Sequence, residues 1–281
     1  MEAIRIAAIM TVFNRKEKTL SCLASLEKNK RDEFILDVFL TNDGCSDGTP
    51  EEVKNRYPWV RIVDGDGSLF WNRGMYKAWC EAEKGNYDFY LWVNDDMIIY
   101  DNALESLLRT SKSKCDKAII VGYTTNSAKD KITYGGRTHS SQLIDKVKGV
   151  TPCSTFNGNF ILIPKNVYSV IGKNDPIFHH GIGDSDYGLR AEKAGISCYI
   201  AADSCGICDT HDKLPKCFDP STPLATRYKR FFKPGGNGAN PNEFFIFRKR
   251  HYGLLPALKT FFSNYLHMLF PSLWSSDPSK F

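Results

Sequence analysis

The sequence predicts an α/β protein with a mostly parallel, Rossmann-like sheet flanked by helices, and with a helical extension at its C-terminus. Two observations predict this fold. Over the first 125 residues, short apolar runs typical of strands alternate with stretches whose apolar residues recur at helical spacing. Beyond residue 254, apolar residues recur at helical spacing again. Alternation of strands and helices favours a parallel sheet covered on both faces.

The elements expected in the first half follow one another closely. Residues 4–10 are expected to form a buried first strand, and Leu20, Leu23 and Leu26 share one face of the helix after it. Next come a strand at 36–40, a helix opening at Pro50, a strand at 60–63, a helix with Trp71, Met75, Ala78 and Trp79, and strands at 89–93 and 118–123.

The rest of the chain divides into two further parts. Residues 126–211 have mixed periodicity, with a strand-like run at 157–164 and a helix at 186–195 that Gly195 closes. We expect this part to extend the same sheet. The boundaries predicted are therefore 1–125, 126–211 and a basic, partly helical extension at 212–281.

Composition favours a globular protein inside the cell. With 281 residues, 42% hydrophobic and 25% charged, the chain can bury a sizeable core. Its nine cysteines are an odd, scattered set, which favours reduced thiols over a disulfide framework. No apolar run is long enough to cross a bilayer, and the N-terminal residues lack a signal-peptide cleavage region, so we expect a cytoplasmic location.

Positive charge is concentrated at the C-terminal end. Residues 212–281 contain 11 Lys and Arg against 4 Asp and Glu, a net charge of +7, whereas the first 211 residues carry −2. This asymmetry fits a phosphate-rich partner, an anionic membrane surface or a solvated basic face. Arg248, Lys249 and Arg250 followed by the amphipathic run 254–270 suit a helix in the lipid headgroup layer; a core helix or a homodimer helix is the alternative.

Four polar segments follow expected strands or open a helix. They are TVFNR at 11–15, TNDGCSDGT at 41–49, NDD at 94–96 and GDSDYGLR at 183–190. Ligands of open parallel sheets bind beyond the carboxyl ends of the strands. Each segment alone is ordinary turn chemistry. If they form one site, however, the carboxylates of Asp43, Asp96 and Asp184 must meet at one cleft.

Asp95 and Asp96 are adjacent carboxylates directly after an apolar strand. They repel one another unless a positive group lies between them. Oxygen ligands suit Mg²⁺ or Mn²⁺. We therefore expect a divalent cation at this position.

The order of these segments resembles the family 2 glycosyltransferases of the GT-A fold, in the group that builds bacterial surface polysaccharides, including rhamnosyltransferases. The resemblance covers roughly residues 4–211. It implies an inverting, metal-dependent hexosyl transfer from a UDP- or dTDP-linked sugar to a glycan or lipid-linked glycan, such as an O-antigen of lipopolysaccharide or a capsule chain. Residues 1–125 would then bind the nucleotide sugar and 126–211 the acceptor, at the inner face of the cell membrane.

The resemblance also assigns roles to particular residues. Asp43 would read the base; Asp184 would be the catalytic base, in a motif where Gly183 replaces the usual Glu. Asp96 would bind the metal, and Asp95 or Asn94 would face the ribose or sugar. His211 would reach the metal or the diphosphate. The residues that would line the acceptor pocket are Asn157, Gly158, His179 and His180. The remaining residues on the donor side would be Thr11, Val12, Phe13, Asn14, Arg15, Trp71, Asn72 and Arg73.

Alternatives remain open for some of these residues. Asp184 could cap a helix, and a basic group at 227–230 could close over the diphosphate. A tetrahedral zinc site could form from Cys205, Cys208, His211 and Cys217.

Other classes of protein share some of these features. A sugar nucleotidyltransferase requires a glycine-rich phosphate loop after the first strand, and a dehydrogenase requires G-x-G-x-x-G there; TVFNRKEKT has neither. A non-catalytic nucleotide-sugar-binding protein would lack a base, whereas Asp184 is present. The basic tail permits nucleic-acid binding, but no stacking motif supports it, so no nucleic-acid partner is expected.

Overall fold

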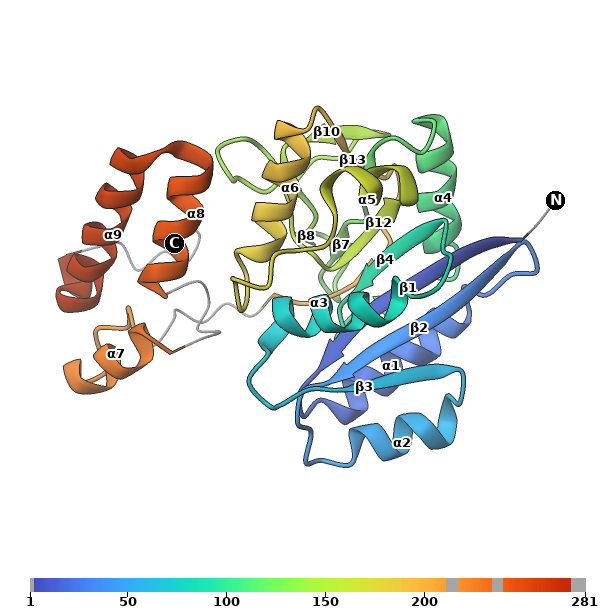
Figure 1. Cartoon of the computed structure of the whole chain (residues 1–281), viewed down its shortest axis with the longest axis horizontal. Helices are drawn as coiled ribbons and strands as arrows, with labels where there is room; N and C mark the ends of the chain where they lie inside the picture. The colour runs from blue at the N-terminus through green and yellow to red at the C-terminus, as the bar shows by residue number, and fades with distance from the viewer. Residues whose placement is uncertain (1–2, 211–216, 234–239, 274–281) are drawn as a thin grey trace.

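An eight-stranded mixed sheet forms the centre of the protein (Figure 1), with the strand order β10-β13-β6-β12-β4-β1-β2-β3. This computed structural model describes residues 3–210, 217–233 and 240–273. The first half of the sheet comes from β1 (Ile4–Val12), β2 (Phe34–Asn42), β3 (Val60–Asp64) and β4 (Phe89–Val93), which are mutually parallel. The predicted mostly parallel α/β fold is confirmed.

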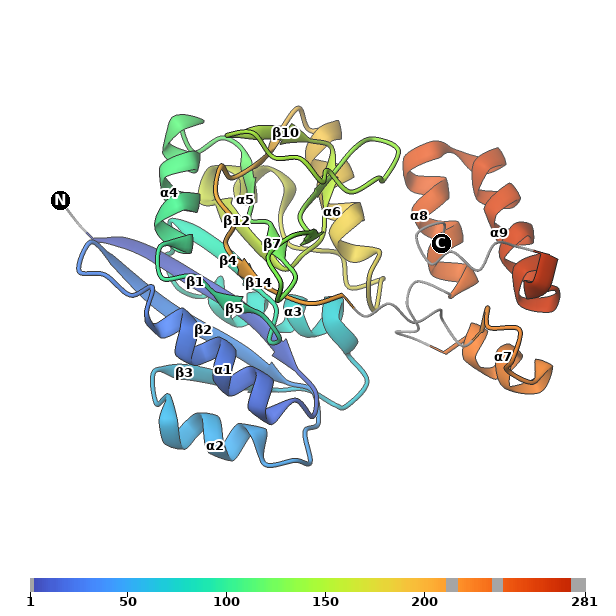
Figure 2. The same ribbon diagram turned by 180° about the vertical axis from the view of Figure 1, so that it is seen from behind.

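Helices cover both faces of this sheet, so the inner strands are apolar on both sides. On one face, α1 (Lys16–Glu27), α2 (Thr49–Arg56) and α4 (Ala103–Ser113) bury Leu23, Val53 and Leu107 against the strands. On the other face lie α3 (Phe70–Ala82), α5 (Lys165–Ile171) and α6 (Gly183–Lys193), which bury Trp79, Val167 and Tyr187. Figures 1 and 2 show these two layers from opposite sides.

The second part of the chain continues the same sheet. The antiparallel strand β12 (Phe160–Pro164) lies between β4 and β6 (Ile119–Val121), and β13 (Cys198–Ile200) and β10 (Thr151–Cys153) extend the edge. Because β12 is antiparallel to β4, its start lies beside the end of β4, with Phe160 opposite Val93. The segment before β12 therefore reaches the edge at which β1, β2 and β4 end.

Two expected elements have different limits. The strand expected at 118–123 is limited to Ile119–Val121, although the Gly122 amide still donates to the Phe160 carbonyl at 2.8 Å. The helix expected at 186–195 begins at Gly183. Small sheets complete this part: β5 (Ile98–Ile99), β14 (Gly206–Ile207), β7 (Thr124–Thr125) and β8 (Ile132–Tyr134) form one, and β11 (Thr155–Phe156) and β9 (Gly136–Arg137) form the other.

The C-terminal extension is helical, as predicted. It consists of α7 (Leu224–Phe231), α8 (Pro241–Tyr252), α9 (Leu254–Leu269) and a 3-10 turn at Pro271–Leu273. Both views show these helices on the side of the protein away from α4, with α8 nearest to α6 and α7 below α8 and α9 (Figures 1 and 2). Over the described part of the chain, no helix combines the length and the apolar character needed to cross a membrane.

Candidate active site

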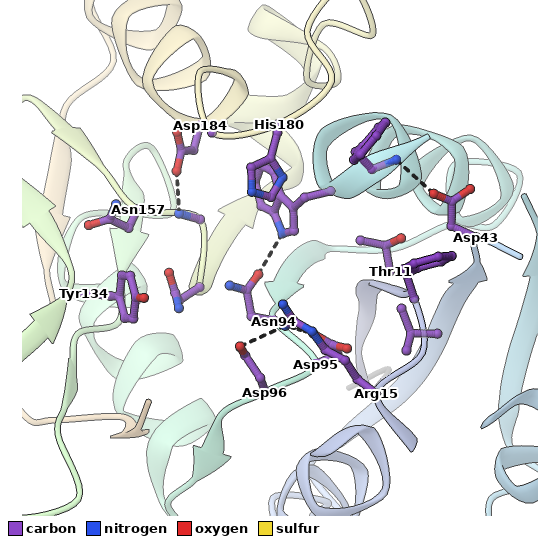
Figure 3. A pocket seen from close by; sticks show the side chains of 17 residues that line it. Thr11, Arg15, Asp43, Asn94, Asp95, Asp96, Tyr134, Asn157, His180 and Asp184 are labelled. Carbon is purple, nitrogen blue, oxygen red and sulfur yellow. Dashed lines mark hydrogen bonds and ion pairs between the residues drawn. The ribbon is translucent and has the colours of Figure 1, made fainter. Parts of the chain in front are cut away.

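A cleft of about 380 Å³ opens where the carboxyl ends of β1, β2 and β4 meet the start of β12 (Figure 3). Its volume is in the range of small-molecule sites. The carboxylates of Asp43, Asp96 and Asp184 all line it, as the sequence analysis expected. Its lining residues are Thr11, Val12, Phe13, Arg15, Asp43, Phe70, Trp71, Asn94, Asp95, Asp96, Tyr134, Asn157, Gly158, Asn159, His180, Gly181 and Asp184.

Asp43 follows β2 and is held by backbone amides at the start of α3. Its Oδ1 accepts hydrogen bonds from the amides of Gly67 at 3.0 Å and Leu69 at 3.2 Å, and its Oδ2 accepts one from Phe70 at 2.9 Å. A carboxylate oxygen has two lone pairs, so Oδ2 keeps one acceptor position. Asp43 is therefore fixed in place and can still accept one hydrogen bond from a ligand.

Asp95 and Asp96 follow β4 and share one arginine. A single guanidinium nitrogen of Arg15 lies 3.2 Å from Asp95 Oδ1 and 2.9 Å from Asp96 Oδ2. Burial raises the pKa of Asp95 to about 6, although the charge of Arg15 lowers it. The next residue toward β4, Asn94, accepts a hydrogen bond from the Trp71 indole at 2.7 Å. The two acidic side chains thus point toward one common position.

Asp184 lies on the opposite side of the cleft, in the first turn of α6 (Figure 3). Its Oδ2 accepts from the Gly158 amide at 3.0 Å and its Oδ1 from the Ser185 amide at 2.7 Å. Burial raises its pKa to about 6, although these backbone hydrogen bonds lower it. The helix cap is Ile182, so Asp184 is not a capping residue but a carboxyl group directed at the cleft.

Comparison with known proteins agrees with this arrangement. Residues 7–171 match the family described as Glycosyl transferase family 2, which is more than half of the chain. The chain belongs to glycosyl transferase family 2. No curated protein sequence matches it.

Two solved structures show the same fold as this glycosyltransferase at low sequence identity. The mannosyltransferase PcManGT from Pyrobaculum calidifontis, in complex with GDP-Man and Mn²⁺, has a TM-score of 0.57 and 12% identity, over 100% of this chain and 78% of that one. Residues 1–349 of S. aureus TarS give a TM-score of 0.58 and 13% identity, over 96% and 92% of the two chains. At such identities the likeness establishes the GT-A fold.

Among the proposed residues of the glycosyltransferase site that the structure describes, four do not line the cleft. Asn72 is fully buried, and its side chain donates to the carbonyls of Asp175 and Phe178 at 2.7 and 2.9 Å. Arg73 donates to the Pro176 carbonyl at 2.7 Å. Both side chains therefore bind the segment before α6 in this structure, and their expected places on the donor side stay predictions.

Asn14 and His179 are also used within the protein. The Asn14 side chain accepts from the Ser46 amide at 2.8 Å and fixes the loop after β2. The His179 ring is 2.6 Å from Glu243 in α8. His180, the next residue, does line the cleft, and burial followed by the charge of Arg15 lowers its pKa.

The zinc alternative is not supported by the residues that the structure describes. His211 lies outside them. Cys205 and Cys208 pack in the core of the main sheet, whereas Cys217 packs among the C-terminal helices. Within residues 3–210, 217–233 and 240–273, no three His, Cys, Asp or Glu side chains are grouped to hold a metal.

The basic group at 227–230 was an alternative contact for the diphosphate. In this structure Arg227, from that group, donates to the Met268 carbonyl at 2.7 Å.

The carboxylates nevertheless fit a divalent cation bound together with a diphosphate. Oxygens of Asp95 and Asp96 converge on one point, now taken by the Arg15 nitrogen. Both acidic side chains are less than a tenth exposed, whereas Arg15 is 43% exposed and can swing away. Two protein carboxylates leave coordination positions for phosphate oxygens and water, as Mg²⁺ prefers.

Three residues that line the cleft were not expected from the sequence: Phe70, Tyr134 and Gly181. Tyr134 ends a short strand of the small sheet, and no local pattern placed that sheet over the cleft. Asn159, which ends the N-G-N run expected to line the acceptor pocket, also lines the cleft, and its carbonyl accepts from the Asn94 amide at 2.9 Å.

Proposed function

We propose that this glycosyltransferase moves a hexosyl group from a UDP- or dTDP-linked sugar to a hydroxyl of a glycan or lipid-linked glycan, with inversion and with Asp184 as the base. The observation that carries the proposal is the placement of Asp96 and Asp184 on opposite sides of one cleft (Figure 3). A single displacement needs the leaving group and the proton acceptor on opposite sides of the sugar.

The donor is proposed to lie along the edge of β1, β2 and β4. The free lone pair of Asp43 suits the imide N–H of a pyrimidine base, beside Val12 and Phe13. Trp71, packed edge-on against Trp92 with ring centroids 5.7 Å apart, offers an apolar surface near the sugar. Arg15 is proposed to bind the diphosphate, because a guanidinium can pair with two phosphate oxygens.

In the proposed reaction, the acceptor oxygen attacks the anomeric carbon and gives its proton to Asp184. The bond between that carbon and the diphosphate oxygen breaks, and its electron pair stays on the diphosphate. Asp184 is suited to the task, since the Gly158 and Ser185 amides fix both of its oxygens and burial raises its pKa to about 6.

Asp96, with Asp95, is proposed to hold Mn²⁺ or Mg²⁺. When bound, such a cation supplies Lewis-acid stabilisation of the negative charge on the departing nucleotide. The PcManGT complex contains Mn²⁺ together with its nucleotide sugar, which supports the choice of metal. His211 stays a proposed further ligand.

A thermal-shift screen of nucleotide sugars, with and without Mn²⁺, tests the proposal. We expect a UDP- or dTDP-sugar to raise the melting temperature in the presence of Mn²⁺, and Asp96→Ala to remove the metal-dependent part of the shift. Release of free nucleotide from the same donor distinguishes an enzyme from a protein that only binds nucleotide sugars. The proposal would be rejected if no donor in the screen raised the melting temperature or released free nucleotide.

The acceptor is proposed to lie at the inner face of the cell membrane. One face of α9 leaves Leu255, Phe262 and Leu266 exposed by 79%, 62% and 49%. Arg230 and Lys233 are exposed at the end of α7, and Lys259 on α9. Apolar stripes with basic neighbours bind anionic interfaces. We expect sedimentation with anionic but not neutral vesicles, and loss of binding in Phe262→Glu.

A further inference from the structure

We infer that α8 of the C-terminal extension is a positioning element of the active site, and that Glu243 and Arg250 hold the acceptor side of the cleft in its working geometry. The inference rests on the proposed function, because it assigns the residues that keep His180 and Asp184 in place. It gives the extension a role in turnover that is separate from any contact with a membrane.

Glu243 is the first of these contacts. It is 8% exposed, and its two carboxylate oxygens contact the same residue. Oε2 accepts from the His179 backbone amide at 3.0 Å, and Oε1 lies 2.6 Å from the His179 ring nitrogen Nδ1. The next residue, His180, lines the cleft. Glu243 therefore fixes the backbone that carries a cleft side chain.

The second contact is an ion-pair cluster around Asp186. Asp186 is fully buried and lies two residues after Asp184, in the first turn of α6. Arg250 of α8 contacts Asp186 Oδ1 at 2.8 Å, and His251 contacts the same oxygen at 2.8 Å. Arg190 of α6 binds the other oxygen at 2.9 Å. Of these three partners among the described residues, Arg250 and His251 come from the extension.

A further pair and an apolar contact complete the docking. The other nitrogen of Arg250 contacts Asp175 at 2.7 Å, at the start of the segment that leads to His180. Phe247 of α8 packs with Phe178, with ring centroids 6.4 Å apart, in a cluster that also contains Ile182. Burial raises the pKa of Asp186, but the hydrogen bonds of His251 and Arg250 and the charge of Arg190 outweigh burial and lower it.

These α8 residues form one helical face, and their side chains contact the acceptor side. Positions 243, 247, 250 and 251 recur at helical spacing. The side-chain contacts described above join them to residues between 175 and 186, whereas Asp43 and Asp96 follow strands β2 and β4. Loosening α8 should therefore lower turnover more than it lowers affinity for the nucleotide.

Glu243→Ala, Arg250→Ala and the control Lys249→Ala test the inference in the full chain. Lys249 is exposed on another face of α8. Hydrogen–deuterium exchange measures the amide exchange rate of residues 176–183, and the exchange rates of β1 and β4 serve as the internal reference. Affinity for UDP and for dTDP, each with Mn²⁺, reports the donor side, and turnover is measured with the donor that the screen identifies.

We expect Glu243→Ala and Arg250→Ala to speed exchange at 176–183 by on the order of tenfold, and to lower kcat by on the order of tenfold, because each removes a charge-assisted hydrogen bond. Affinity for the nucleotide should stay within about twofold of the original chain. Glu243→Gln, which keeps an acceptor for the His179 amide, should restore most of the rate, and Lys249→Ala should change nothing.

Unchanged exchange at 176–183 would overturn the inference, as would faster exchange with unchanged kcat, or a loss of nucleotide affinity in step with kcat. If Glu243→Ala does not fold, Arg250→Ala, whose side chain is 30% exposed, decides by the same criteria. Exchange requires no substrate, so a chain without transferase activity would reject the proposed function and still show whether α8 holds this segment.

Discussion

The guanidinium of Arg15 lies 2.9 Å from Asp96 Oδ2, at the point where this carboxylate and Asp95 converge. A positive side chain therefore neutralises the acidic pair where a divalent cation was expected. Arg15 comes from the loop between β1 and α1, and Asp96 from the end of β4, so the pair joins two neighbouring strand ends. A bound cation and Arg15 would compete for the same oxygens.

Arg15→Ala should strengthen Mn²⁺ binding in the absence of nucleotide. The side chain is 43% exposed, and ion pairs of this kind contribute up to about 1 kcal/mol, so the gain in affinity should be roughly fivefold. Titration of Mn²⁺ followed by electron paramagnetic resonance measures it. Weaker Mn²⁺ binding in this variant would mean that Arg15 supports the cation instead of competing with it.

The rate of transfer should rise with pH through about 6. Burial raises the pKa of Asp184 to about 6, and a base must be ionised to accept a proton, so kcat should fall about tenfold per pH unit below that value. Burial also raises the pKa of Asp95 to about 6, so acid should weaken cation binding as well. Measuring kcat at saturating concentrations of Mn²⁺ and donor removes the effect of weaker cation binding and leaves the effect of Asp184. A kcat that is constant down to pH 5 would exclude Asp184 as the base.

Asp184→Asn should stabilise the protein at pH 7.5. In the folded protein the pKa of Asp184 is about 6, above the ordinary value of 3.8. Protonated Asp184 therefore contributes stability that is fully present below about pH 3.8 and is lost as the pH rises through 6. At pH 7.5 the ionised group costs about 3 kcal/mol. Asparagine removes this cost but loses one acceptor for a backbone amide, about 1 kcal/mol, which leaves a gain of about 2 kcal/mol.

Denaturation curves at two pH values check this prediction. The gain should shrink to about zero at pH 4.5, where much less of the ionisation cost is present. A variant that is less stable than the original chain at pH 7.5 would show that the carboxylate is well solvated or better paired than its surroundings indicate.

Gly183→Ala should destabilise the protein although it lies in a helix. Alanine is favoured over glycine in helices by about 1 kcal/mol, but a Cβ at Gly183 would lie 1.9 Å from Asn72 Oδ1. The clash should cost about 1–3 kcal/mol. A double-mutant cycle with Asn72→Ala, measured by chemical denaturation, tests whether the clash with Asn72 is the cause. In an Asn72→Ala background, Gly183→Ala should be neutral or stabilising, and an unchanged penalty there would refute the steric explanation.

Periodicity was sufficient to predict the parallel half of the sheet. The inner strands are apolar on both faces, and Leu20, Leu23 and Leu26 recur at helical spacing in α1. The same reasoning placed Asp43 and Asp96 at one edge, because parallel strands end together. Sequence patterns could not show that antiparallel β12 would insert between β4 and β6, and so bring Asn159 beside Asn94.

Side-chain partners far apart in the sequence were beyond local reasoning. Asn72 and Arg73 were expected on the donor side, yet their side chains hydrogen-bond to the segment at 175–178. Gly183 departs from the usual Glu of the family motif, and the structure supplies a physical reason, since Asn72 fills the space that a side chain would need. The docking of α8 on Asp186 depends on residues 64 and 65 positions apart.

Donor binding and turnover of Asp184→Asn, measured on the same preparation with Mn²⁺ and the nucleotide sugar found by thermal shift, test the central claim most directly. The account predicts donor affinity within about twofold of the original chain and a kcat lowered by roughly 10²–10⁴, which is the range for a general base. Turnover close to that of the original chain, with the donor still bound, would contradict it.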